Sequence, residues 1–550
     1  MTRWTPRPSR LVAFATTAVA LAALAVATAP TAGAAVPAVV PSTAASVTAD
    51  ALPTAQINGV AWTQEVVGTT VFVGGEFTKA RPAGTAVGSS AEVTRTNLLS
   101  YDLRTGALTS WAPQVDGAVR DIAVSPDGKT LFVAGAFSTF DGQPRYRLAA
   151  LDLATRKLVP NFAPAFDYTV NSIVVTARVV YAAGAFNRVG DVTRSKLAAV
   201  NIARGTLTAW DPGADGDVNA LLMAPGGSTT LVVGGAFSQL GGGTSTGGPT
   251  TARGLGAVRT GNAAVVSWAA NERVQDYGTN SAILSLSTDG RQVYATGYVY
   301  GAPGNLEGTV ATDNKGNIVW VEDCHGDTYG SYPVGGLVYV VGHSHDCSTV
   351  GGFPDTTPQT HYPALAFTRD VRGTLGTNTV TGYANWGGTP APALTGWFPT
   401  MAAGSYTGQT QAAWTITGSG DYVVVGGEFP SVNGTPQQGL VRFAKPSTAP
   451  NAVGPRYGGS QVPLTFAVDG RTVTVSSPAN TDQDDMRLTY TIVRDDVTVG
   501  TVNAVSAPWL RPTVSFRDTS VPAGRHVYQV RATDADGNRA WSDKQAVTVP

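Results

Sequence analysis

The chain has 550 residues, of which 43% are hydrophobic and 14% are charged, and its formal net charge is −1 at pH 7. Because it has no excess of positive charge, it lacks the electrostatic signature of a nucleic-acid-binding protein, and no nucleic-acid partner is expected. The 64 glycines and 34 prolines favour many short strands joined by tight turns.

The N-terminus carries the pattern of an export signal. Positive residues up to Arg10 precede the apolar run 11–29, and Ala32-Gly33-Ala34 offers a small-residue cleavage site. A membrane anchor is the alternative, because the run approaches the roughly 18 residues that a span requires. The many alanines in the run favour cleavage. We therefore predict a signal peptide over 1–34, a linker over 35–50, and a secreted mature protein without a membrane span, in which a disulfide can persist.

One short motif recurs along the chain: an apolar strand that ends in glycine and is often followed by phenylalanine, as in VFVGGEF and LFVAGAF. The aligned glycines of its seven copies are Gly75, Gly135, Gly184, Gly235, Gly297, Gly342 and Gly427. An apolar run and a turn precede each copy, and further strands such as LAALDLAT (148–155) follow. Four strands per unit are typical of a propeller blade, so the sequence predicts an all-β chain with a seven-bladed β-propeller over 51–445. A solenoid of stacked hairpins is the alternative architecture.

A dipeptide opens the first strand of each unit. These dipeptides are Ile57-Asn58, Val119-Arg120, Val170-Asn171, Val218-Asn219, Thr279-Asn280, Thr328-Tyr329 and Thr410-Gln411. The seventh unit ends at 440–444 without a clear fourth strand. Since a propeller must close its ring, we expect residues near 45–55 to complete this blade.

The repeats resemble those of secreted actinobacterial multidomain proteins and, more distantly, the fungal cortical polarity-marker propellers. The resemblance rests on VxVGGxF followed by a glycine-containing turn, and it covers 51–445. It implies a propeller fold but no particular activity, because one fold can support many functions.

Carboxylates recur just before the first strand of several units. Asp116, Asp167, Asp215 and Asp276 share this place, and His325 takes it in the sixth unit. The inner strands of a propeller line its axial channel, so these groups are candidates for binding a ligand or cation at the channel mouth. The alternative is that each Asp starts its strand through an Asx turn.

Two glutamates share one motif position in units that a closed ring makes neighbours. Glu76 and Glu428 could together perform acid–base chemistry on a glycoside. Other repeats carry alanine at this position, which favours a solvated or bridging role instead.

Residues 324–347, CHGDTYGSYPVGGLVYVVGHSHDC, hold both cysteines of the chain. Gly335-Gly336 predicts a two-residue hairpin turn. Pairing across this turn places Cys324 directly opposite Cys347, which is near disulfide reach. The sequence therefore predicts a Cys324–Cys347 disulfide.

The same stretch contains candidate metal ligands. His343 and His345 lie two residues apart and share one face of their strand, whereas strict register turns His325 and Asp327 to the other face. A divalent metal is the one cofactor that these residues suggest, but a site with all the histidines requires a bulge, since zinc takes three or four ligands. The alternative is that the histidines bond turns beside the disulfide. The pattern CHGDTY…GHSHDC also resembles a segment of the actinobacterial propeller proteins, which implies a shared feature there.

An insertion near 351–409 is rich in glycine, proline and threonine and contains Tyr383, Trp386 and Trp397. Aromatic side chains among polar neighbours suit sugars or protein partners, so these three are a candidate ligand platform. Packing of a long loop onto the propeller is the alternative.

A linker (446–456) leads to alternating strands over 457–550, which predict an immunoglobulin-like sandwich. The stretch AGRHVYQVRATDADGNRAWS resembles a fibronectin type III domain, with Tyr528 placed like the tyrosine-corner residue. The acidic segments 482–485 and 533–537 could suggest calcium, although turn chemistry also explains them.

We find no G-x-S-x-G, P-loop, H-E-x-x-H or dinucleotide fingerprint in the sequence. The sequence therefore favours a secreted or cell-surface binding or adhesion protein, with cell-wall association considered, whose partner is an extracellular glycan or protein. The alternative is a secreted carbohydrate-active enzyme, a glycosidase or lyase.

Overall fold

The computed structural model describes residues 46–244 and 248–550. The predicted signal peptide and most of the predicted linker 35–50 lie outside these described residues. Within them the chain is all-β, and its strands pair antiparallel. The helical segments are two short 3-10 turns, Ala269–Glu272 and Ser348–Val350. No helix in these residues has the length and hydropathy needed to cross a bilayer.

Each repeat glycine of the sequence lies in the second strand of an antiparallel sheet. In chain order the sheets are β2 (Val60–Val67), β3 (Thr70–Glu76) and β6 (Leu98–Asp102); β7 (Val119–Val124), β8 (Thr130–Gly135), β11 (Leu148–Asp152) and β12 (Lys157–Leu158); β13 (Val170–Val175), β14 (Val179–Gly184) and β17 (Leu197–Asn201); β18 (Val218–Met223), β19 (Thr230–Gly235), β22 (Leu255–Arg259) and β23 (Val265–Val266); β24 (Ser281–Thr288), β25 (Val293–Val299), β26 (Gly308–Thr312) and β27 (Ile318–Glu322); β28 (Thr328–Val334), β29 (Leu337–Ser344) and β30 (Tyr362–Thr368); β33 (Ala413–Ser419), β34 (Tyr422–Gly427) and β37 (Leu440–Ala444).

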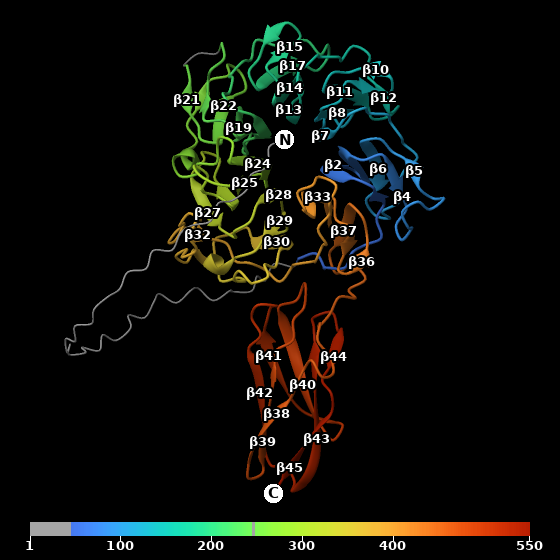
Figure 1. Cartoon of the computed structure of the whole chain (residues 1–550), viewed down its shortest axis with the longest axis vertical. Coiled ribbons are helices and arrows are strands. Elements are labelled where there is room, and N and C mark those ends of the chain that lie inside the picture. The colour runs from blue at the N-terminus through green and yellow to red at the C-terminus, as the bar shows by residue number, and fades with distance from the viewer. Residues whose placement is uncertain (1–45, 245–247) are drawn as a thin grey trace, which may run out of the picture. The chain divides into compact units, whose positions relative to one another are not determined.

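The sheets are arranged radially around a central axis, as in a β-propeller (Figure 1). The first strand of each sheet packs beside the first strand of the next, and β33 of the last sheet packs beside β2 of the first. The second and third strands are buried on both faces; β8, for example, contributes Leu131, Phe132 and Val133 to cores on either side. Such burial explains why these strands are almost continuously apolar in the sequence.

The N-terminal segment of the described chain runs along the outer strand of the last sheet. The Thr48 amide donates to the Ala444 carbonyl at 2.8 Å, and the Leu52 amide donates to the Arg442 carbonyl at 2.9 Å. This pairing agrees with the expectation that residues near 45–55 complete the seventh unit. It begins at Thr48, slightly before the predicted propeller start at residue 51.

Short arms of two strands connect the second and third strands of several sheets, and in the first sheet β1, from before its first strand, adds a third strand to the arm. They are β4 (Lys79–Arg81) with β5 (Val93–Thr94) and β1 (Gln56–Ile57); β9 (Thr139–Phe140) with β10 (Gln143–Pro144); β15 (Arg188–Val189) with β16 (Val192–Thr193); β20 (Gln239–Leu240) with β21 (Thr250–Thr251); and β35 (Ser431–Val432) with β36 (Thr435–Pro436). A further pair, β31 (Gly373–Thr374) with β32 (Pro390–Ala391), lies within the predicted insertion.

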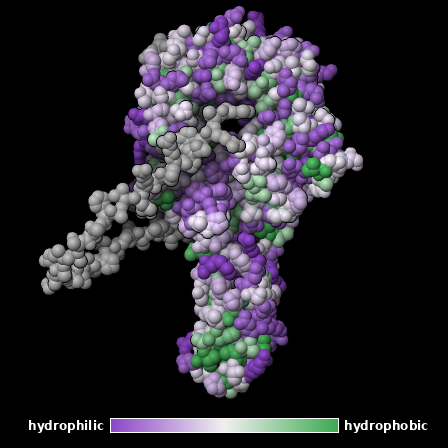
Figure 2. All heavy atoms as spheres, in the orientation of Figure 1, coloured by the Kyte–Doolittle hydropathy of each residue, from purple (hydrophilic) through white to green (hydrophobic). Residues whose placement is uncertain are grey.

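The C-terminal module has two antiparallel sheets that share one hydrophobic core. The first contains β38 (Thr465–Asp469), β39 (Thr472–Pro478) and β42 (Thr513–Asp518); the second contains β41 (Val497–Val505), β40 (Arg487–Arg494), β43 (Gly524–Thr533), β44 (Arg539–Trp541) and β45 (Gln545–Val549). The core includes Tyr490 and Tyr528, both almost fully buried. In the view of Figure 2, hydrophobic side chains gather most densely on the surface of this module, whose exposed apolar residues include Val468 and Val497.

Candidate functional site

The first strand of every propeller sheet carries a β-bulge near its start. At this point the pairing with the second strand shifts by one residue, and one residue of the first strand is left without an opposite partner. The bulged residues are Trp62, Arg120, Asn171, Asn219, Leu284, Tyr329 and Trp414. A bulge bends the strand and re-aims the side chain of the extra residue. All of these side chains line a single cavity.

The bulge also explains why the repeat motif contains glycine. A Cβ atom at Gly75 would overlap the carbonyl oxygen of Val60 on the neighbouring strand, and a Cβ at Gly135 would overlap that of Ala118. The backbone of the bulged strand therefore approaches the second strand too closely for any side chain at this position.

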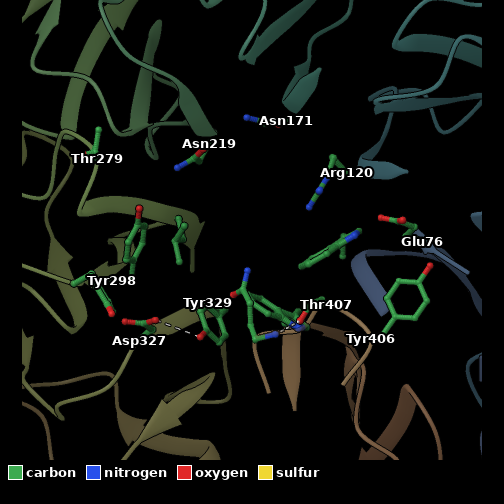
Figure 3. Close-up of a pocket in the computed structure, with 15 residues that line it drawn as sticks. Glu76, Arg120, Asn171, Asn219, Thr279, Tyr298, Asp327, Tyr329, Tyr406 and Thr407 are labelled. Carbon is green, nitrogen blue, oxygen red and sulfur yellow. Dashed lines mark hydrogen bonds between the residues drawn. The ribbon is translucent and has the colours of Figure 1, made fainter. Parts of the chain in front are cut away.

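The cavity has a volume of about 940 Å³ and lies where the inner strands converge (Figure 3). Besides the bulged residues, its lining comprises Glu76, Thr279, Tyr298, Tyr300, Asp327, Tyr406, Thr407 and Gln409. Its size is in the range of small-molecule sites. Every sheet of the propeller contributes at least one lining residue, so the cavity depends on the assembled fold.

Aromatic rings form one part of the lining. Trp62 and Trp414 meet edge to face, with ring centroids 5.0 Å apart, and Tyr329 packs on Trp414 at 4.1 Å. Tyr300 is 91% exposed and extends the aromatic surface to solvent. An aromatic surface beside polar groups is suited to the apolar faces of sugar rings.

A buried glutamate holds one side of the cavity in place. Glu428 accepts hydrogen bonds from the Thr407 amide at 2.8 Å, the Thr407 hydroxyl at 2.6 Å and Trp414 Nε1 at 3.0 Å. Its carboxylate is therefore engaged in positioning the loop and ring that line the cavity. Glu76 occupies the same motif position but is exposed and lines the cavity itself, so the two glutamates play different roles.

Two asparagines add polar groups to the lining. Asn171 Nδ2 donates to the Val218 carbonyl at 3.1 Å, and Asn219 Nδ2 donates to the Ile283 carbonyl at 3.0 Å. Each amide thus bridges to the next sheet. Within the described part of the chain the amide oxygens accept no hydrogen bond, which leaves them able to accept from the hydroxyl groups of a ligand.

Asp327 is a carboxyl group of the lining whose pKa is raised. Burial raises its pKa to about 6. The Tyr329 hydroxyl lies 3.3 Å from Asp327 Oδ2 and 3.0 Å from His343 Nδ1. Burial lowers the pKa of His343 to about 4. These three side chains therefore form a hydrogen-bonded group beside the cavity, in which Asp327 is the member whose pKa lies nearest to neutral pH.

The aspartates predicted to ring the channel mouth lie in turns. Asp116 Oδ1 accepts from the Ser138 and Thr139 amides at 2.7 and 2.8 Å. Asp167, Asp215 and Asp276 make the equivalent pair of bonds to the loop after the second strand of their own sheets. Other residues line the cavity. The aspartates therefore have a structural role, as the alternative held, but not through a local Asx turn: each carboxylate oxygen accepts from two successive amides of a loop that lies 20 to 30 residues further along the chain.

The predicted disulfide is confirmed. Cys324 and Cys347 are bonded, with their Cα atoms 4.2 Å apart. The register between Gly330 and Val341 is the one predicted from the glycine turn, and the His325–Asp346 bridge restores it next to the cysteines. The bond therefore fastens the open end of the β28–β29 hairpin.

The histidines gather more closely than the sequence suggested. The ring of His325 lies 6.3 Å from that of His345, and His361 lies 6.2 Å from His345 and 5.5 Å from His343. The strict register holds at His325, which pairs with Asp346, yet its ring still lies within 6.3 Å of the ring of His345. His361 was not included in the predicted group, because it lies in the segment after the hairpin.

This gathering does not amount to a metal site in the described residues. Within residues 46–244 and 248–550, no three His, Cys, Asp or Glu side chains are arranged to hold an ion. His343 bonds the Tyr329 hydroxyl, and His345 Nε2 lies 3.3 Å from the Tyr383 hydroxyl. The candidate ligands His325, His343, His345 and Asp327 therefore point to different partners and not to one centre.

The predicted aromatic platform requires correction. Trp397 is fully buried and Trp386 is 3% exposed, and their indole nitrogens donate to the Thr48 and Asn305 carbonyls. Tyr383 stacks on His325 at 3.8 Å. The insertion packs these rings against the propeller, so Trp386 and Trp397 cannot present a surface to a ligand.

Solved structures similar to this chain include the following two. A chain in the crystal structure of the mitotic checkpoint complex aligns with 79% of this chain and 98% of its own length, at 11% sequence identity and a TM-score of 0.41. The β-propeller domain of Cps50 (Swd1) from Myceliophteria thermophila aligns with 73% of this chain and 99% of its own length, at 10% identity and a TM-score of 0.40. The chain matches no protein-family model and no curated protein.

Proposed function

We propose that the chain is an exported binding or adhesion protein whose central cavity holds an extracellular glycan. The observation that carries this proposal is the cavity, into which every sheet delivers a bulged side chain. Its mixture of aromatic rings, amides, hydroxyls and carboxylates suits a sugar, which presents apolar ring faces and many hydroxyl groups. A protein partner bound at the same mouth is the other ligand of this proposal.

The proposal includes a seven-bladed propeller and a fibronectin type III-like sandwich that spaces it from the cell or wall. The blade count is supported by the repeat glycines and by the packing of β33 beside β2. The sandwich is supported by the shared core of two sheets and by Tyr528, whose buried hydroxyl donates to Asp518 Oδ2 at 2.7 Å. Secretion rests on the N-terminal sequence pattern alone.

A glycan array with the purified protein tests this function. We expect binding of a defined set of glycans and a loss of affinity of roughly two- to tenfold in Tyr300→Ala, because Tyr300 lines the cavity and is 91% exposed. Tyr168→Ala is the matched control, since Tyr168 is 61% exposed and lies outside the lining. A protein that binds no glycan, or equal losses in both variants, would refute glycan binding in the cavity.

An enzyme acting on carbohydrate is the second candidate, because Asp327 faces the cavity with a raised pKa. A carboxyl group that keeps its proton near pH 6 can serve as a general acid. Incubation with polysaccharides and assay of released reducing ends separates the two candidates. Turnover that is abolished in Asp327→Asn would replace the binding function with a catalytic one.

A further inference from the structure

Arg120 is the one basic side chain among the residues that line the cavity. It is the bulged residue of β7, and its guanidinium lies 4.4 Å above the ring of Trp62. Stacking on an indole fixes the plane of the guanidinium while leaving its N–H donors at the edge. Figure 3 shows the side chain extending into the cavity from the β7 side.

The donors of Arg120 have no partner within the described residues. Neither a hydrogen bond nor an ion pair joins Arg120 to residues 46–244 or 248–550. Burial lowers its pKa, and the nearby Glu76 only partly offsets this effect. The Arg120 donors are not buried away from solvent, so they are accessible to a ligand that supplies hydrogen-bond acceptors.

Three other arginines of the propeller donate to backbone and hydroxyl acceptors, whereas the half-buried Arg156 resembles Arg120 in stacking on aromatic rings, Phe72 and Trp111, but does not line the cavity. Arg95 Nη1 and Nη2 donate to the Thr94 and Thr109 carbonyls at 2.8 and 2.9 Å. Arg194 makes the corresponding bonds in its own sheet, and Arg442 bonds three acceptors near the N-terminal segment. Arg95, Arg194 and Arg442 therefore hold neighbouring backbone segments together, whereas the donors of Arg120 lie in the lining of the cavity, where a ligand can reach them.

The groups around Arg120 restrict what the ligand can be. Glu76 and Asp327 are carboxyl groups in the same lining, and the Asn171 and Asn219 amides present acceptor oxygens. A small, highly charged anion would be repelled by the two carboxyl groups. A molecule with one anionic group among many hydroxyl donors satisfies both Arg120 and the acceptors.

We infer that Arg120 binds the anionic group of an acidic sugar, so that the preferred ligand is a glycan containing uronic acid or a sulfate ester. The inference rests on the proposed glycan binding and specifies its substrate class. A guanidinium presents two parallel N–H donors that match the two oxygens of a carboxylate or sulfate, which gives geometric selectivity beyond charge alone.

The test compares acidic and neutral glycans on the purified protein and on three variants. For the acidic glycans bound by the wild type, we expect Arg120→Gln to weaken binding about tenfold or more, as for loss of hydrogen bonds to a charged group. Arg120→Lys should recover part of the loss, because it keeps the charge but not the paired donors. Arg178→Gln, at an exposed turn, should bind as the wild type does. Uronic-acid and sulfated oligosaccharides form separate arms and identify which anion is recognised.

A measurement on the wild type alone keeps the test decisive if Arg120→Gln fails to fold. Affinity for acidic glycans should fall with added salt, and affinity for neutral glycans should not. Binding of neutral glycans only, or acidic binding that is insensitive to Arg120 and to salt, would overturn this inference while leaving glycan binding intact. A protein that binds no glycan would overturn the proposed function itself.

Discussion

Four carboxyl groups of the fifth and sixth sheets, Asp276, Glu307, Glu322 and Asp323, are buried or half-buried and form no ion pair within the described residues. Burial raises the pKa of Asp276, Glu307 and Glu322 to about 7 and that of Asp323 to about 8. The fold therefore favours their protonated forms. For each group the stability contribution is complete below the unfolded pKa near 4 and is lost as the pH rises through the folded value.

Glu322→Gln tests this at a single residue. Glu322 is fully buried, its Oε1 accepts from the Cys324 amide at 2.9 Å, and its Oε2 has no partner within the described chain. An amide keeps the acceptor and needs no proton, so the variant should gain stability relative to the wild type between pH 5 and pH 8, by on the order of 2 kcal/mol.

Chemical denaturation of both proteins at the two pH values measures the difference. Glu272→Gln, at an exposed position, should show no such dependence on pH. A Glu322→Gln variant whose relative stability is the same at both pH values would show that the carboxyl is ionised in the native protein.

Some parts of the site could be predicted from single residues of the sequence, and others could not. The repeat glycines recur because backbone crowding requires them, as at Gly75, and they identified the sheets correctly. The aspartates recur for a structural reason too, so their recurrence was a poor sign of function. The bulged residues of the cavity are tryptophan, arginine, asparagine, leucine and tyrosine, so no single residue type recurs at this position in every sheet.

A positional signal for the cavity nevertheless exists. The opening dipeptides contained Arg120, Asn171, Asn219 and Tyr329, which the structure places in the lining. In the first, fifth and seventh units the predicted dipeptide lies a few residues before the bulged residue, because the lengths of the turns between the strands vary. The register relative to the repeat glycine locates the bulge directly, since the residue just before the bulge pairs with that glycine in most sheets.

At the scale of elements, the β28–β29 hairpin is held by its turn and by the disulfide. The cysteines are 23 positions apart, and a cross-link that closes a loop of this length contributes about 3 kcal/mol by restricting the unfolded chain. The bonded cysteines lie near His343 and Asp327, so the hairpin also supports one wall of the cavity.

Replacing both cysteines by alanine should lower the free energy of unfolding by roughly 2–4 kcal/mol. Thermal unfolding with and without a reductant measures the effect in the wild type, and the double variant should no longer respond to reductant. Glycan binding should weaken as well if the hairpin positions Tyr329 and Asp327. A reductant-insensitive wild type with unchanged stability would exclude a stabilising role for the bond.

At the scale of the whole propeller, closure depends on the segment from Thr48 to Thr54. Arg442 is 2% exposed and ties this segment to the first and last sheets: its guanidinium donates to Thr54 Oγ1, to the Leu103 carbonyl and to the Pro53 carbonyl. This segment therefore joins the beginning of the propeller to its last strand, which closes the ring.

A chain that begins at Gly59 should therefore unfold at a markedly lower temperature than one that begins at Val36, because the last sheet loses its outer pairing and Arg442 loses its acceptors. Arg442→Ala in the longer chain should reproduce part of the loss. Differential scanning calorimetry of the three proteins makes the comparison. Full stability of the Gly59 chain would show that the circle closes without this segment.

The residues that support the fold and the residues that contact a ligand occupy different positions in each sheet. One inserted residue per sheet reaches the shared hollow, while the packing that supports it is carried by other positions. Single substitutions at the bulged positions can therefore change which molecule the cavity binds while the packing of the sheets stays the same. Proteins with matching repeat glycines need not recognise the same compound, and their specificities are best compared at these inserted positions.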